Sequence, residues 1–158
     1  MQPEIRTVLA RRYVMVERKG FGEEGNMVAP EAVMALYDYV ARNDLLDKMD
    51  LRFGSVPDAM ADLPAAEQRY QAGWFLKDGA VVPHEDGVLQ DTLTGGRTAV
   101  FRHLGGYEGL GETWGAIFGG WLQASGQTPR AAQSYEVYTV MNNDDPALNV
   151  TEICVPIL

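Results

Sequence analysis

The sequence predicts an α+β fold in which one strand–helix–strand–strand repeat occurs twice about a pseudo-twofold axis, with antiparallel sheets and two main helices. The first observation is a repeated segment: "TVLARRYVMVERKG" (7–20) resembles "TLTGGRTAVFRHLG" (92–105). The second is that a helical pattern and then two short strands follow each segment. We expect repeat one at residues 1–76, a linker at 77–87 and repeat two at 88–158. One repeat alone is marginal in size, so we expect a shared core with a central ligand cleft.

The first repeat opens with an apolar strand within residues 7–20. A helix is expected near residues 29–43, because Val33, Leu36 and Val40 recur at helical spacing. The strands "RFGSV" and "RYQAGWFL" follow, joined by a turn-rich loop. Their order fits an antiparallel arrangement of neighbouring strands.

The second repeat follows the same order. Leu110, Trp114 and Ile117 begin a strong amphipathic stripe that predicts a helix near residues 108–125. Gly111, Gly115 and Gly119 recur on this helix, a spacing that lets another element or a ligand approach the backbone closely, and we expect packing against a sheet or a neighbouring helix. The strands "SYEVY" and "VTEICVPI" complete the repeat.

Composition excludes several classes of function. The chain has 158 residues, and its 13 Lys and Arg against 22 Asp and Glu give a net charge of −9, which disfavours direct nucleic-acid binding. No apolar run is long enough to span a membrane, so no membrane partner is expected. The single cysteine, Cys154, with only His84 and His103, predicts neither a disulfide nor a metal site, and no cofactor is expected. The simplest location is the cytoplasm.

The carboxylate of Glu136 is the main candidate for a functional group. It stands between two tyrosines in "SYEVY", a segment that reads as a half-buried strand. Strand alternation puts Ser134, Glu136 and Tyr138 on one face. From the residues alone, Glu136 is equally well explained as a solvated strand position or as the charge of a pocket.

Aromatic side chains could form the wall of such a pocket, since their faces attract cations. The candidates are Tyr138, Trp74, Tyr107, Phe101 and Trp114. The position of Trp114 on the apolar helix stripe also fits a core role. Trp74 and Tyr138, on strands, are better placed to face a ligand.

The motifs "GRTAVFRHLGGYEGLGETW", "SYEVY", "NNDDP" and "TEICVPI", in this order, resemble the GyrI-like small-molecule-binding family. Its members include effector-binding domains of AraC-type and MerR-type multidrug regulators and stand-alone proteins. The resemblance covers essentially the whole chain. It implies a stand-alone binding protein whose Glu136 meets the positive charge of a planar, amphipathic ligand.

Two alternative functions stay open. Some members of the family hydrolyse strained, cyclopropane-bearing, DNA-alkylating compounds, and in that case Glu136 and Tyr138 would be the catalytic residues. Other members inhibit DNA gyrase, which makes gyrase or a regulator protein an alternative partner. Nothing in the residues separates binding from hydrolysis.

Overall fold

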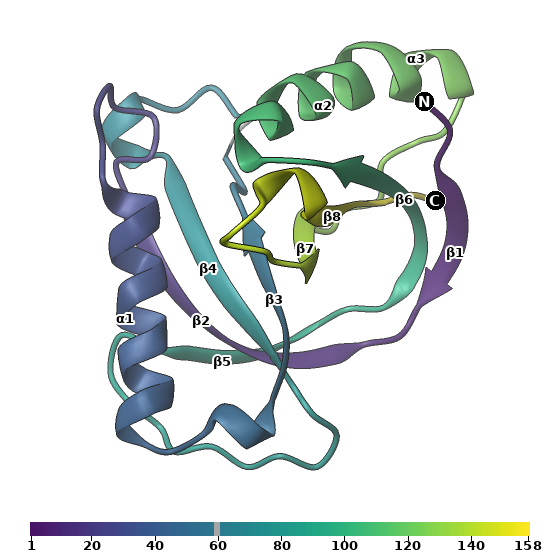
Figure 1. The fold of residues 1–158 in the computed structure, drawn as a ribbon. Helices are drawn as coiled ribbons and strands as arrows, with labels where there is room; N and C mark the ends of the chain where they lie inside the picture. The colour runs from purple at the N-terminus through teal and green to yellow at the C-terminus, as the bar shows by residue number, and fades with distance from the viewer. Residues whose placement is uncertain (59–60) are drawn as a thin grey trace. The chain divides into compact units, whose positions relative to one another are not determined.

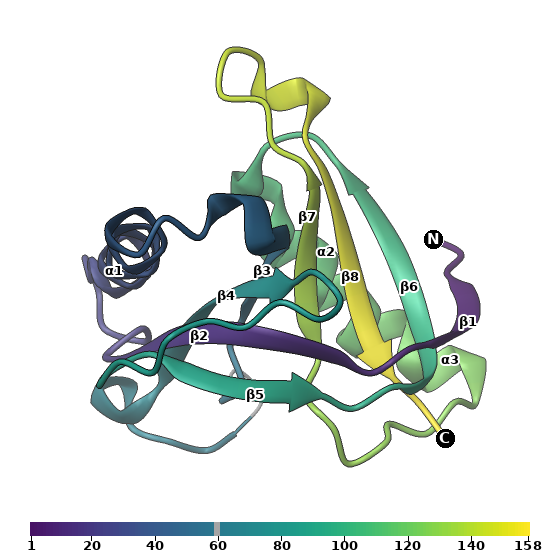
Figure 2. The ribbon, with the colours of Figure 1, turned by 90° about the horizontal axis from the view of Figure 1, so that it is seen from below.

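The computed structural model describes residues 1–58 and 61–158, which form two compact units. The first unit is Ala10–Leu93, and the second combines Met1–Leu9 with Thr94–Leu158. Each unit carries antiparallel strands and a main helical segment, which confirms the predicted α+β class (Figures 1 and 2). Among the described helices, none has the length and apolar character needed to cross a membrane.

The described part of the first unit contains four neighbouring antiparallel strands and one long helix. In chain order its main elements are β2 (Arg11–Lys19), α1 (Val28–Arg42), β3 (Met49–Ser55), β4 (Arg69–Leu76) and β5 (Leu89–Leu93). The strands lie in the order β3-β4-β2-β5. Figure 1 shows α1 running along this sheet. The short helical turns Leu46–Lys48 and Ala65–Glu67 lie in its loops.

The helix α1 forms where helical spacing predicted it, because one of its faces is apolar. Ala32, Leu36, Tyr39 and Val40 are buried on that face and pack with residues of β2 and β4. Glu31 in the first turn and Arg42 in the last turn both complement the helix dipole. The helix is thereby fixed to the sheet through a single continuous core.

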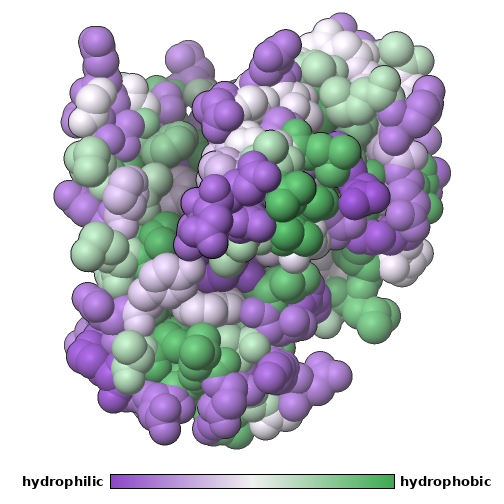
Figure 3. Space-filling view, viewed as in Figure 1, coloured by the Kyte–Doolittle hydropathy of each residue, from purple (hydrophilic) through white to green (hydrophobic). Residues whose placement is uncertain are grey.

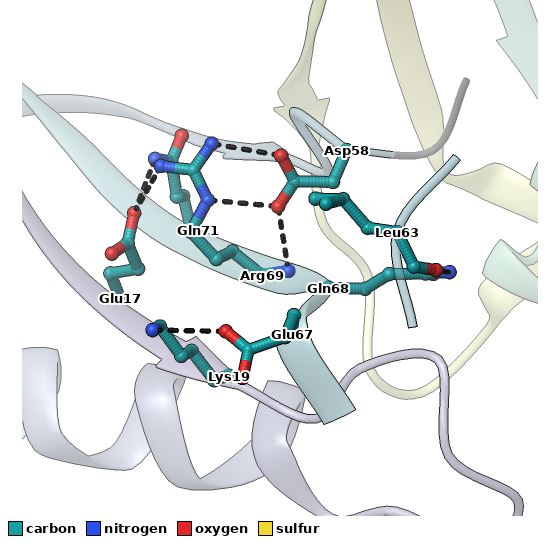
Figure 4. A network of polar contacts seen from close by, with 8 residues as sticks. All are labelled: Glu17, Lys19, Asp58, Leu63, Glu67, Gln68, Arg69 and Gln71. Carbon is teal, nitrogen blue, oxygen red and sulfur yellow. Dashed lines mark hydrogen bonds and ion pairs between the residues drawn. The ribbon is translucent and has the colours of Figure 1, made fainter. Parts of the chain in front are cut away.

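A polar network ties the loop after β3 to β4 (Figure 4). The guanidinium of Arg69 donates to both oxygens of Asp58, from Nε at 2.8 Å and from one terminal nitrogen at 2.9 Å. Glu17 of β2 accepts from Arg69 and, at 2.8 Å, from the Gln71 amide. The hydrogen bond from Arg69 holds the pKa of Asp58 below its ordinary value. A forked pair of this kind fixes geometry as well as charge.

The second unit repeats the strand–helix–strand–strand order, with an additional strand before it where the first unit has one after it. Its main elements are β1 (Glu4–Val8), β6 (Gly96–Leu104), α2 (Leu110–Ala116), α3 (Leu122–Ser125), β7 (Tyr135–Val140) and β8 (Val150–Pro156). The strands lie in the order β1-β6-β8-β7, all antiparallel. A short helical turn, Pro146–Leu148, lies between β7 and β8.

The helix predicted near residues 108–125 changes its pitch along its length. It opens as a 3-10 turn at Tyr107–Gly109, continues as α2, widens into a π-helical segment at Ile117–Trp121 and ends as α3. Gly119 and Gly120 lie within the π-helical segment. At Gly111, Gly115 and Gly119, no described atom beyond the local helix backbone lies within 4 Å of where a Cβ would stand. The expected close packing on the glycines is therefore wrong, and these positions lower the stability of the helix.

Each sheet also contains a strand from a distant part of the sequence. β1 pairs with β6, with Ile5 opposite Ala99, and β5 pairs with β2, with Gln90 opposite Val14. At the start of β6, Gly96 has a φ of 140°, where a side chain would be strained and would meet the Arg130 guanidinium at 2.9 Å. The glycine thus permits the turn into β6.

Candidate functional site

Glu136 lies on the helix-facing side of the second unit's sheet. It stands opposite Ile153 of β8, which in turn stands opposite Phe101 of β6. Ile153 and Phe101 belong to the core that packs against the helical segment. The neighbouring residues of Glu136, Tyr135 and Val137, are buried on the other face, as strand alternation requires. Glu136 is therefore a partly buried carboxylate on a core-facing row.

Two aromatic donors hold the carboxylate of Glu136. Trp114 Nε1, on α2, donates to Oε1 at 2.5 Å. The Tyr138 hydroxyl, on the same strand, donates to Oε2 at 3.0 Å. Because charge-assisted hydrogen bonds are short and directional, this arrangement fixes the orientation of the carboxylate.

Burial raises the pKa of Glu136 above its ordinary value. The hydrogen bonds from Trp114 and Tyr138 and the nearby His103 act in the opposite direction and favour the charged form. The site therefore contains a carboxylate whose charge is costly and only partly compensated. A cation beside it would reduce that cost.

Further rings surround the two donors. Tyr107 meets Tyr138 edge to face, with ring centroids 5.5 Å apart. Trp114 stacks on Phe118, with centroids 5.6 Å apart and planes 11° apart. Tyr107 is exposed, so one side of this cluster is open to solvent. The cluster offers flat apolar faces beside a carboxylate.

A row of polar side chains lies next to Glu136 on the same face of the sheet. His103, Thr151 and Tyr138 stand opposite one another across β6, β8 and β7. His103 lies 2.9 Å from Thr113 Oγ1 and 3.0 Å from the carbonyl oxygen of Gly106. The buried Thr151 Oγ1 has no hydrogen-bond partner among the described residues. His103 thus links the strand to the start of the helix.

Phe101 and Trp74 are the remaining sequence candidates. Phe101 is fully buried in the core and meets Trp121 edge to face at 4.9 Å. Trp74 belongs to the first unit, where its Nε1 donates to the carbonyl of Asp50 at 2.8 Å. Within the second unit, the structure brings together Glu136, Tyr138, Tyr107 and Trp114.

Trp74 has its own cluster, which sequence reasoning missed. The guanidinium of Arg52 lies over the rings of Tyr37 and Trp74, 5.1 Å and 5.6 Å from their centroids. Arg52 also donates to the carbonyl of Gly73 at 3.0 Å and to the Tyr37 hydroxyl at 3.2 Å. Arg52 stands opposite Trp74 in the β3–β4 pair. The sequence contained one signal for this cluster. Arg52 begins the strand "RFGSV", which was expected beside the aromatic strand "RYQAGWFL".

Surface shape alone does not identify the Glu136 cluster. A hollow of about 370 Å³ in the first unit is lined by Arg11, Arg12, Asp50, Lys77 and neighbouring residues. It is polar and contains none of the sequence-predicted site residues. Among the described residues, no group of His, Cys, Asp and Glu could hold a metal ion.

Comparison with known protein families identifies the class of domain that this fold represents. The GyrI-like small molecule binding domain matches residues 1–158. The chain belongs to this family, which confirms the resemblance seen in its motifs.

Solved structures share the fold at low sequence identity. The C-terminal domain of EcmrR is 13% identical, with a TM-score of 0.74, and the match covers 99% of this chain and 97% of that one. A protein solved with tetraphenylphosphonium bound, SAV2435, is 14% identical, with a TM-score of 0.63 over 100% and 94% of the two chains. A hydrolase from Listeria innocua is 12% identical, with a TM-score of 0.68 over 99% and 92%.

Proposed function

We propose that this protein binds amphipathic organic cations and that Glu136 recognises their positive charge. The observation that carries the proposal is the carboxylate held by Trp114 Nε1 and the Tyr138 hydroxyl within a cluster of aromatic rings. Its charge is disfavoured by burial. A bound cation offsets that desolvation and gains attraction from the ring faces.

The shape and charge of the surroundings of Glu136 support one class of ligand. Flat rings on Tyr107, Tyr138 and Trp114 favour planar or multiply aromatic ligands over compact, strongly hydrated ions. The net charge of −9 attracts cations at long range. The binding of tetraphenylphosphonium by a structural neighbour supports the same ligand class here.

The direct test compares a cation with a neutral compound of similar shape. Tetraphenylphosphonium and triphenylphosphine oxide are titrated by calorimetry into the wild type and Glu136→Gln. The variant keeps the shape and removes the charge. We expect Glu136→Gln to weaken the binding free energy of the cation by roughly 1.5–3 kcal/mol, the range of a charge-assisted contact. The affinity for the neutral compound should stay nearly unchanged.

The matched control is Glu112→Gln, which removes one exposed carboxylate from the same helical segment. It should leave both affinities within about twofold, since an exposed charge is screened. Equal losses in the two variants would attribute cation binding to net charge, and the proposal for Glu136 would fail.

Hydrolysis is the second candidate, supported by the pairing of Glu136 with the Tyr138 hydroxyl and by the hydrolase among the structural neighbours. In that function Glu136 would act as a general base toward water, and Tyr138 would protonate the departing group. Mass spectrometry of a cyclopropane-bearing electrophile after incubation tests it. A hydrated product lost in Glu136→Gln supports hydrolysis, and unchanged compound that remains bound supports binding alone.

A further inference from the structure

The helix α1 has a second apolar face, opposite the one that packs on its sheet. Every member of this stripe is exposed, and the spacing between members alternates between three and four residues. The stripe consists of Met27, which caps the helix, and Pro30, Met34, Tyr37 and Ala41. Tyr37 lies at its border, since its ring also meets that of Trp74 edge to face at 5.1 Å and its hydroxyl accepts from Arg52. Met27 is 61% exposed and Met34 is 65% exposed. We call this set the α1 stripe.

This exposure is unusual for a surface helix. A helix with a buried face normally carries polar residues on its other side. The α1 stripe instead repeats apolar residues at the three-and-four spacing of a coiled-coil seam. Figure 3 shows apolar atoms between hydrophilic ones over the region where α1 runs in Figure 1. Exposed methionines are typical of surfaces that bind helices, because their side chains adapt to the partner.

One edge of the α1 stripe is acidic. Glu31 and Asp38 lie seven residues apart, two turns of α1, and neither forms an ion pair with a described residue. Beside Asp38, a hollow of about 240 Å³ is lined in part by Arg42, Glu85 and Asp86. The charge of Arg42 is already engaged, since it binds Glu85 at 2.8 and 2.9 Å. The edge therefore retains negative charge.

We infer that the α1 stripe docks an amphipathic α-helix of another protein, one with apolar residues at the same spacing and Lys or Arg along one flank. The apolar spacing supplies the helix-to-helix contact. The acidic edge favours a basic partner over an acidic one and fixes the orientation of the partner helix.

The charges argue against a second copy of this chain as the occupant. An antiparallel pairing of two α1 helices sets the acidic edge of one copy against the acidic edge of the other. Like charges at such flanking positions oppose association. A basic helix meets the same apolar stripe without this repulsion.

The test uses defined peptides as probes of the partner class. A fluorescein-labelled 21-residue Leu/Lys peptide, (LKKLLKL)₃, and its Leu/Glu counterpart are titrated by fluorescence anisotropy at 150 mM salt. The key variant is Met34→Glu, which removes an apolar anchor and adds a negative charge. The matched control is Val81→Glu, which adds the same charge at an exposed loop of the same unit.

We expect the wild type and Val81→Glu to bind the Leu/Lys helix alike, and Met34→Glu to bind it at least tenfold more weakly. Glu31→Gln combined with Asp38→Asn should weaken binding several-fold and flatten its salt dependence. Circular dichroism confirms that each variant is folded. Because the Leu/Lys helix is expected to bind to α1, Glu136→Gln should change none of these affinities.

Three results would overturn the inference. If Met34→Glu and the wild type bound the Leu/Lys peptide equally, the peptide would be attracted by the net charge of the protein and not by the α1 stripe. Equal binding of the Leu/Glu helix, or binding of neither helix, would exclude a basic helical partner. Sedimentation showing a dimer that Met34→Glu dissociates would assign the α1 stripe to a second copy of the chain.

Discussion

The two units place opposite charges in similar aromatic surroundings. In the second unit, the Trp114 indole and the Tyr138 phenol donate their N–H and O–H to the Glu136 carboxylate. In the first unit, the Tyr37 and Trp74 rings lie beneath the Arg52 guanidinium, and the Tyr37 hydroxyl accepts from it. Each charged residue lies on the strand that follows the main helix of its unit.

The difference between Arg52 and Glu136 shows that similar aromatic surroundings can stabilise a unit or leave a buried charge available to a ligand. Arg52 is 4% exposed and its own charge occupies the ring faces of Tyr37 and Trp74, so this cluster stabilises the first unit. At Glu136 the buried charge is a carboxylate, and burial raises its pKa. Under the proposed function, we therefore expect a cationic ligand to bind beside Glu136 and not beside Arg52.

The largest expected effect comes from removing the internal cation. Arg52→Ala loses the hydrogen bonds to Gly73 and Tyr37 and the contacts with the Tyr37 and Trp74 rings. We expect the free energy of unfolding to fall by about 3 kcal/mol, because hydrogen bonds from a charged donor and two cation–π contacts are lost together. Chemical denaturation measures it. Arg102→Ala, at an exposed position, should change stability by less than about 0.5 kcal/mol, and equal losses would refute a structural role for Arg52.

The next largest effect on stability is expected at Asp58, whose carboxylate links a loop to β4 in the first unit. Asp58→Asn removes a charge that Arg69 binds with two nitrogens. We expect a loss of about 2 kcal/mol at pH 7, typical of hydrogen bonds to a charged group. The pKa of Asp58 is lowered on folding, so its contribution exists above the unfolded-state pKa and is lost as pH falls through the folded-state pKa. Denaturation curves that stay separated by the same amount at the lowest pH would contradict this.

A smaller, stabilising effect is expected in the helical segment that carries Trp114. Gly115 lies in α2 with open space where a Cβ would stand. Gly115→Ala should raise the free energy of unfolding by about 0.5–1 kcal/mol, the difference in helix propensity. Thermal denaturation measures the gain. A loss of stability would mean that the position requires glycine for close packing.

The smallest effect on stability is expected at Glu136, and its pH dependence has the opposite sign to that of Asp58. The pKa of Glu136 is raised on folding, so its contribution is fully present below the unfolded-state pKa and is lost as pH rises through the folded-state pKa. Relative to Glu136→Gln, the wild type should therefore lose stability as pH rises from 4 to 8. Parallel stability profiles for the two proteins would show that Glu136 is solvated like a surface residue.

Apolar spacing was sufficient to predict the main helices and the order of strands, because burial imposes that spacing directly. The same spacing does not reveal hydrogen-bond pitch, so the π-helical turn at Ile117–Trp121 was not predicted. Strand partners are also absent from a local pattern, and the pairing of β1 with β6 became visible only in the structure.

Side-chain roles were harder to predict where one residue combines two properties. Trp114 lies on the apolar stripe, and its indole N–H still reaches Glu136. Phe101 was expected at a ligand, and the row it shares with Ile153 places it in the core. Arg52 was missed because a buried arginine reads locally as a solvated strand residue. The contributions of all six sequence candidates to ligand binding stay predictions, namely Trp74, Phe101, Tyr107, Trp114, Glu136 and Tyr138.

The central claim is that a bound cation meets the Glu136 carboxylate, and carboxyl-carbon NMR measures this most directly. The Glu136 signal, assigned by its absence in Glu136→Gln, is titrated with pH in the free protein and at saturation with tetraphenylphosphonium. Because burial raises the pKa of free Glu136, a neighbouring positive charge should lower it. A lowered pKa with the cation, and no such decrease with triphenylphosphine oxide, is the predicted result. An unchanged or raised pKa in the cation complex would contradict the account.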